Sequence, residues 1–149
     1  MTNDRLTNKS REALQQAQAH AAKRGNPEIL PEHVLLTLLR QEQGAVRPIL
    51  QKAGADLRAL EASLEKHLDG LPRVSGGSDP GLGRRTMAML NHADEEAKAL
   101  KDQFVSVEHL LLAVMRHDRD ASAHFERSKA RLDAVMTALR EVRGAQSVT

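Results

Sequence analysis

Apolar residues recur every three to four positions along nearly the whole chain, which is the period of an α-helix. The first apolar stripe follows Thr7, whose hydroxyl suits a helix N-cap, and it stops before Gly25. Later helices are delimited by Pro31 in a first turn, Gly54 after a short helix, and Asp56 as a cap. No segment shows the strict alternation of a half-buried strand. The pattern predicts an all-α fold.

The two halves of the chain repeat each other. An offset of 76 positions aligns them without a gap from Leu6 to Arg40. It superimposes Leu6 on Leu82, Leu14 on Leu90, Glu32 on Glu108, and His33 on His109. Because each half contains an apolar helix that needs a partner, we expect a pseudo-twofold pair of four-helix motifs, eight helices in all, around one core.

One domain, residues 1–149, accommodates this repeat. Repeat one covers 4–69, a linker rich in Gly, Pro and Ser covers 70–81, and repeat two covers 82–143. In repeat two, Lys129 stands where repeat one has Gly54. The missing glycine predicts that the seventh helix runs on or turns differently. After Arg143 the helical pattern stops, so residues 144–149 are expected to form a tail.

Composition excludes several classes of function. The 22 Lys and Arg residues are nearly balanced by 20 Asp and Glu residues, and the basic residues are dispersed. Phe104 and Phe125 are the two aromatic residues, too few for base stacking. No apolar run reaches the length of a membrane span, and the start lacks a signal core. We therefore expect no nucleic acid, no membrane, and a cytoplasmic location, consistent with the absence of cysteine.

Catalytic motifs are absent from the sequence. There is no Gly-x-x-x-x-Gly-Lys-Ser/Thr loop, no Gly-x-Ser-x-Gly elbow and no His-Glu-x-x-His helix. His33 and His109 occupy equivalent positions, which favours a shared packing role over metal binding. Glu32 and Glu108 suit helix starts, where a carboxylate complements the helix dipole. We expect no catalytic residue, no metal and no cofactor in this chain.

Several segments resemble a known family. They are residues 4–9 (Asp-Arg-Leu-Thr-Asn-Lys), residues 41–50, residues 71–74 (Leu-Pro-Arg-Val), and the Pro31-x-His33-x-Leu35-Leu36 and Glu108-His109-Leu110-Leu111 signatures. In this order, over a double repeat, they resemble the N-terminal (Clp N) domain of ClpB-type AAA+ chaperones, across essentially the whole chain.

The resemblance implies a larger protein. Such chaperones form hexameric rings that thread aggregated or unfolded polypeptides with help from the DnaK system, and ATP and Mg²⁺ would bind only in their AAA+ modules. The N-terminal domain helps to engage the substrate, and residues 144–149 would begin its tether to the ring. The isolated domain is expected to be a monomer.

The family's substrate-handling polar cluster matches Thr7, Asp102 and Glu108 in this sequence. A shallow groove beside it would bind apolar segments. The apolar candidates for that groove are Leu90, Phe104, Val107 and Leu110. Each residue also has a structural interpretation, because Thr7 and Glu108 suit helix starts, Asp102 can order a loop, and apolar stripe positions usually pack in the core. His92 and His109 would make such a groove more polar.

Other functions stay open. A ClpA- or ClpC-like unfoldase has a related N-terminal domain that docks adaptor proteins for a protease. A small metal-dependent enzyme would use the histidines, and a purely structural module would bind no ligand. Residues 4–9 and the Gln-Glu-x-Gly segment favour the ClpB-type interpretation.

Overall fold

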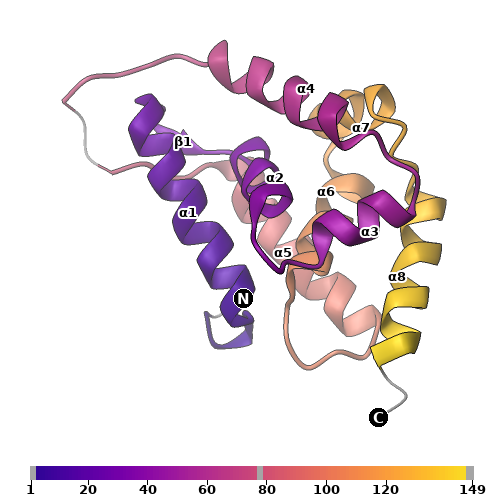
Figure 1. The fold of residues 1–149 in the computed structure, drawn as a ribbon. Coiled ribbons are helices and arrows are strands. Elements are labelled where there is room, and N and C mark those ends of the chain that lie inside the picture. The colour runs from indigo at the N-terminus through magenta and orange to yellow at the C-terminus, as the bar shows by residue number, and fades with distance from the viewer. Residues whose placement is uncertain (1–2, 77–78, 147–149) are drawn as a thin grey trace.

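The computed structural model describes residues 3–76 and 79–146. Within them the chain forms eight α-helices, two short 3₁₀ turns and one pair of two-residue strands (Figure 1). The helices are α1 (Asn8–Arg24), α2 (Pro31–Arg40), α3 (Val46–Lys52), α4 (Leu57–Asp69), α5 (Arg84–Ala99), α6 (Val107–His117), α7 (Ser122–Arg127) and α8 (Leu132–Gln146). The 3₁₀ turns are Asn3–Arg5 and Arg119–Ala121, and the strands are β1 (Glu28–Ile29) and β2 (Gly81–Leu82). The predicted all-α fold is confirmed.

Helix ends follow the signals in the sequence. The Thr7 side chain accepts a hydrogen bond from the Ser10 N–H at 3.1 Å, so it caps α1. The Asp56 carboxylate likewise caps α4 through the Ala59 N–H at 3.0 Å. Gly25 ends α1 in the left-handed region with φ 76°. At the other end of the chain, α8 continues through residues 144–146, later than the pattern predicts. The remaining tail residues, 147–149, lie outside the described residues.

The core is built around α2 and α6, which are equivalent in the two repeats. Nearly every residue of α2 is buried, and α6 is buried over most of its length. Helix α1 packs on α2, α5 packs on α6, and α3 contacts α8 from the other repeat. Burying each leucine side chain contributes about 2 kcal/mol to the free energy of unfolding, so these two helices and the four buried leucines of α4 contribute much of the stability.

Short strand contacts, which the sequence pattern did not predict, join the two repeats. Ile29 in β1 pairs in parallel with Leu82 in β2, and Leu6 makes the equivalent bridge to Val105. Two residues are too few to show alternation, so the expectation of no strand was wrong here. In each bridge, the segment before the first helix of one repeat pairs with the segment before the second helix of the other.

Buried hydroxyl groups reinforce both bridges. Ser10 Oγ donates to the Val105 carbonyl at 3.0 Å, and Thr86 Oγ1 donates to the Ile29 carbonyl at 2.7 Å. Since Ser10 and Thr86 are separated by the repeat offset of 76, these contacts obey the pseudo-twofold relation.

The seventh helix ends as its counterpart does. Lys129 adopts φ 59° at the position equivalent to Gly54, whose φ is 85°. Lys101 adopts φ 60° at the position equivalent to Gly25. The prediction that the missing glycine would change this turn was wrong, because a lysine takes up the left-handed conformation instead.

Candidate functional site

The loop between α5 and α6, residues 100–106, is held by Asp102. Its N–H donates to the Ala97 carbonyl at 2.8 Å, which closes the end of α5. Its carboxylate contacts His109 Nε2 at 2.8 Å on one oxygen and the guanidinium of Arg143 in α8 on the other. The loop is therefore fixed to α5, α6 and α8 at once.

The charge of Asp102 is stabilised by these partners. Partial burial alone would raise the pKa of the Asp102 carboxyl, but hydrogen bonds from Arg143 and His109 outweigh it and hold the pKa below its ordinary value. Asp102 is thus an anion over the whole neutral range, and it carries a positioning role for the loop.

Glu108 lies at the start of α6 beside Ser106. The Ser106 hydroxyl donates to the Glu108 carboxylate, and the Ser106 N–H donates to Nδ1 of His109 at 2.8 Å. Because His109 accepts at Nδ1, its proton sits on Nε2 and points at Asp102. The structure thus joins Asp102 and Glu108 into one chain of hydrogen bonds.

Thr7 reaches the same loop from the other repeat. Its N–H donates to the Val105 carbonyl at 3.0 Å, next to Phe104. Thr7, Leu6 and Phe104 line a shallow pocket of about 290 Å³, whose remaining walls are Asp4, Asn8 and Arg11. Thr7 and Phe104 therefore share a pocket, while Asp102 and Glu108 lie in the network behind the loop.

The four apolar candidates separate into two kinds. Phe104 is 48% exposed, and Leu90 is partly buried against the core. Val107 and Leu110 are only 3% and 0% exposed, since α6 is enclosed by its neighbours. The prediction that Val107 and Leu110 line the groove is therefore corrected, because both side chains are buried in the core, where a ligand cannot contact them in this conformation.

Repeat one contains a related but uncharged arrangement. His33 accepts from the Leu30 N–H at 2.9 Å and contacts Asn26 Oδ1 with Nε2 at 2.9 Å. Asn26 is the counterpart of Asp102 under the repeat offset. His33 and His109 are both buried, so their predicted packing role is confirmed.

Glu32 behaves differently from its counterpart Glu108. It is 0% exposed, and both carboxylate oxygens accept hydrogen bonds from Arg85 in α5, at 3.1 and 2.9 Å. Asp118 also binds Arg85, at 3.0 and 3.2 Å. Sequence reasoning missed Arg85, Asp118 and Arg143, because their partners lie on distant helices and no spacing signals the pairing.

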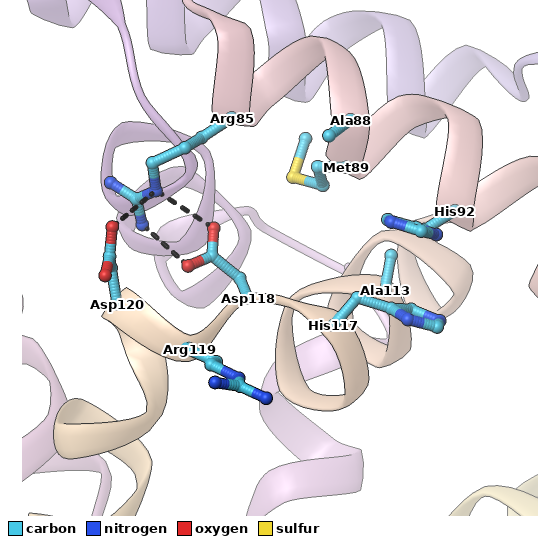
Figure 2. Close-up of a pocket in the computed structure, with 9 residues that line it drawn as sticks. All are labelled: Arg85, Ala88, Met89, His92, Ala113, His117, Asp118, Arg119 and Asp120. Carbon is cyan, nitrogen blue, oxygen red and sulfur yellow. Dashed lines mark hydrogen bonds and ion pairs between the residues drawn. The ribbon is translucent and has the colours of Figure 1, made fainter.

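A second pocket of about 290 Å³ lies between α5 and α6 (Figure 2). Arg85 lies between Asp118 and Asp120 at one end of it. His92 and His117 stack at the other end, with ring centroids 3.9 Å apart. His92 therefore faces this α5–α6 pocket, whereas His109 lies in the network with Asp102 and Ser106.

Two four-helix repeats that share one core, with an exposed aromatic ring on an anchored loop, define an all-α double-repeat domain. The chain belongs to the Clp repeat (R) N-terminal domain family, whose sequence profile matches residues 5–128. It is 37% identical over 145 residues to the chaperone protein ClpB of Corynebacterium efficiens. That match covers 96% of this chain and 17% of the relative, so the chain spans about a sixth of the relative's length.

Solved structures share the fold. The N-terminal domain of Hsp104 from Candida albicans superimposes with a TM-score of 0.82 at 21% identity, covering 93% of this chain and 91% of that one. A ClpV N-domain in complex with a VipB peptide superimposes with a TM-score of 0.75 at 20% identity, covering 92% and 86%. In the described part of the chain, no helix is long and apolar enough to cross a membrane.

Proposed function

We propose that this domain binds exposed apolar segments of unfolded or aggregated polypeptides, as the N-terminal part of a larger ClpB-type chaperone. The observation that carries the proposal is Phe104, a large apolar side chain that is 48% exposed on an anchored loop beside a pocket. A ring held out by a fixed loop loses little conformational entropy on binding, which favours contact with an apolar segment.

The pocket around Phe104 favours weak binding of apolar segments with little selectivity among them. The pocket that Phe104 shares with Leu6 and Thr7 is shallow and has charged residues at its edge. A shallow pocket of this size binds only a side chain or two. Several copies on a hexameric ring would raise the local concentration of such sites, so useful avidity would not need tight binding by one domain.

The remaining assignments follow from the ClpB-type relatives. ATP and Mg²⁺ would bind in AAA+ modules that this chain does not contain, and DnaK would act through other domains. The bound segment would pass from this domain to the ring.

We place the domain in the cytoplasm and expect it to be a monomer in isolation. The peptide bound to the ClpV neighbour supports ligand binding by this fold.

An NMR titration with a permanently unfolded, apolar-rich polypeptide tests the proposal. We expect shifts around Phe104 and Thr7 that are lost in Phe104→Ala. Met87→Ala is the matched control, since Met87 is 55% exposed on α5 outside this pocket, and it should bind as the unchanged chain does.

The alternatives predict other outcomes. Shifts on another face would keep binding but remove Phe104 from the site. No shifts at millimolar polypeptide would overturn the proposal, and binding of an adaptor protein in its place would support the ClpA- or ClpC-like role.

A further inference from the structure

Three potential metal ligands converge where the two repeats meet, away from Phe104. Glu32 lies in the first turn of α2, His67 in the last turn of α4, and His124 in α7. One ligand atom from each lies within 4.8 Å of the others. Glu32 and His124 are buried, and the His67 side chain is 36% exposed, so the cluster opens to solvent on one side.

We propose that Glu32, His67 and His124 bind one Zn²⁺ ion, with water as the fourth ligand. Two imidazole nitrogens and one carboxylate oxygen form an established zinc donor set. Tetrahedral zinc with bonds of about 2.0 Å keeps its ligand atoms about 3.3 Å apart. His67 Nε2 and the Glu32 carboxylate are already 3.5 Å apart.

The surroundings of His124 allow its Nε2 to face a metal. Its Nδ1 lies 2.6 Å from Ser63 Oγ, which also accepts a hydrogen bond from Arg127 at 3.2 Å. Since Arg127 can only donate, Ser63 Oγ has a second lone pair free for the Nδ1–H of His124. That tautomer leaves Nε2 unprotonated and available to a metal, with Ser63 as the outer partner that histidine ligands usually have.

Arg85 does not neutralise the site. Its guanidinium holds Glu32, but it is shared with Asp118 and with Asp120, whose carboxylate is 3.5 Å away. Three carboxylates stand against the two guanidinium groups of Arg85 and Arg127, which leaves one negative charge in excess for a divalent cation. The bidentate contact also fixes the orientation of the Glu32 carboxylate.

Such an ion would join repeat one, through α2 and α4, to repeat two, through α7. Zinc binding should therefore stabilise the folded chain in proportion to its affinity. This site differs from the sequence-based expectation of no metal, because its three ligands come from separate helices with no shared spacing.

Calorimetric titration of the chelator-treated 149-residue chain with Zn²⁺ tests the site. We expect one ion per chain and a Tm that rises with Zn²⁺ concentration. His67→Ala should weaken binding at least tenfold and abolish the rise in Tm. His92→Ala is the matched control, because His92 has a similarly exposed side chain, at 35%, and should leave binding unchanged.

A second variant separates ligand orientation from folding. Ser63→Ala removes the outer partner of His124 without touching a ligand, and it should weaken Zn²⁺ binding by about tenfold or more. Absence of binding at millimolar Zn²⁺ would overturn the proposal. Equal binding by the unchanged chain and by His67→Ala would overturn it too, as would loss of binding in His92→Ala.

Discussion

Asp102 and its counterpart Asn26 present different groups at equivalent positions, a carboxylate in repeat two and an amide in repeat one. Each side chain is hydrogen-bonded to Nε2 of a buried histidine, His33 for Asn26 and His109 for Asp102. Asp102 also forms an ion pair with Arg143, whereas Asn26 carries no charge. Asp102→Asn should keep the contact with His109 and lose the ion pair, lowering the free energy of unfolding by about 1 kcal/mol. Asp102→Ala leaves the buried His109 N–H without its acceptor and should cost about 2 kcal/mol.

Urea unfolding of the two variants measures this difference. Equal losses for Asp102→Asn and Asp102→Ala would show that the ion pair with Arg143, rather than the histidine contact, dominates at this position.

His33 should make the stability depend on pH. Burial, reinforced by the neighbouring His20, lowers the pKa of His33 from 6.5 to about 4. Between these values the unfolded chain binds a proton that the folded chain does not. Stability is therefore full above pH 6.5 and falls by about 3 kcal/mol as the pH drops toward 4. The lowered pKa values of His20 and His124, both caused first by burial, act in the same direction.

Histidine ring signals in NMR spectra, followed from pH 8 to pH 4, measure the titration directly. Denaturant unfolding at pH 7 and pH 4.5 gives the accompanying loss of stability. Titration of His33 near pH 6.5 in the folded chain would contradict this account.

At the scale of the helices, the residues that follow α5 and α7 have strained backbone conformations that glycine would adopt without strain. Lys101 and Lys129 adopt the left-handed conformation, which costs a non-glycine residue about 1 kcal/mol or more. Lys129→Gly and Lys101→Gly should each raise the free energy of unfolding by about 0.5–1 kcal/mol, because glycine relieves this strain but makes the unfolded chain more flexible by about 0.4–1 kcal/mol.

Gly54→Ala provides the reverse experiment. No atom lies within 4 Å of the Cβ that alanine would add, so its cost, about 1 kcal/mol, comes from the backbone conformation alone. Thermal unfolding measures all three variants, and a destabilised Lys129→Gly would contradict the assignment of strain.

Local signals predicted the helices because each helix start and stop depends on a few neighbouring residues, such as Thr7 and Asp56. The strands β1 and β2 escaped prediction because each is formed by a partner more than fifty positions away. The same limit applies to the candidate site. The resemblance pointed to Asp102, and Phe104 was an apolar candidate beside it, but the anchoring of their loop by Arg143 depends on the packing of α8.

For the whole molecule, the interlocked bridges predict a single cooperative unfolding transition. Ser10→Ala and Thr86→Val each remove a buried hydrogen bond between the repeats and should lower the free energy of unfolding by about 1–2 kcal/mol. Thr137→Val is the control, because its hydroxyl bonds to the Asp133 carbonyl on the exposed face of α8, and it should change stability by less than about 0.5 kcal/mol.

Circular dichroism and NMR signals from both repeats, followed during unfolding, measure this coupling. Both repeats should lose structure together in every variant. Loss of one repeat before the other in Ser10→Ala would show that the bridges do not couple them.

Each bridge pairs a segment of one repeat with a segment of the other, and this affects whether the two halves of the chain can fold separately. Leu6 precedes α1 but pairs with repeat two, and Leu82 precedes α5 but pairs with repeat one. Each half, if made separately, would lack the strand contact and the hydroxyl bond that the other half supplies. A chain cut between Gly76 and Asp79 should therefore yield two fragments that are unfolded alone and reassemble on mixing, which would make the domain suitable for fragment complementation.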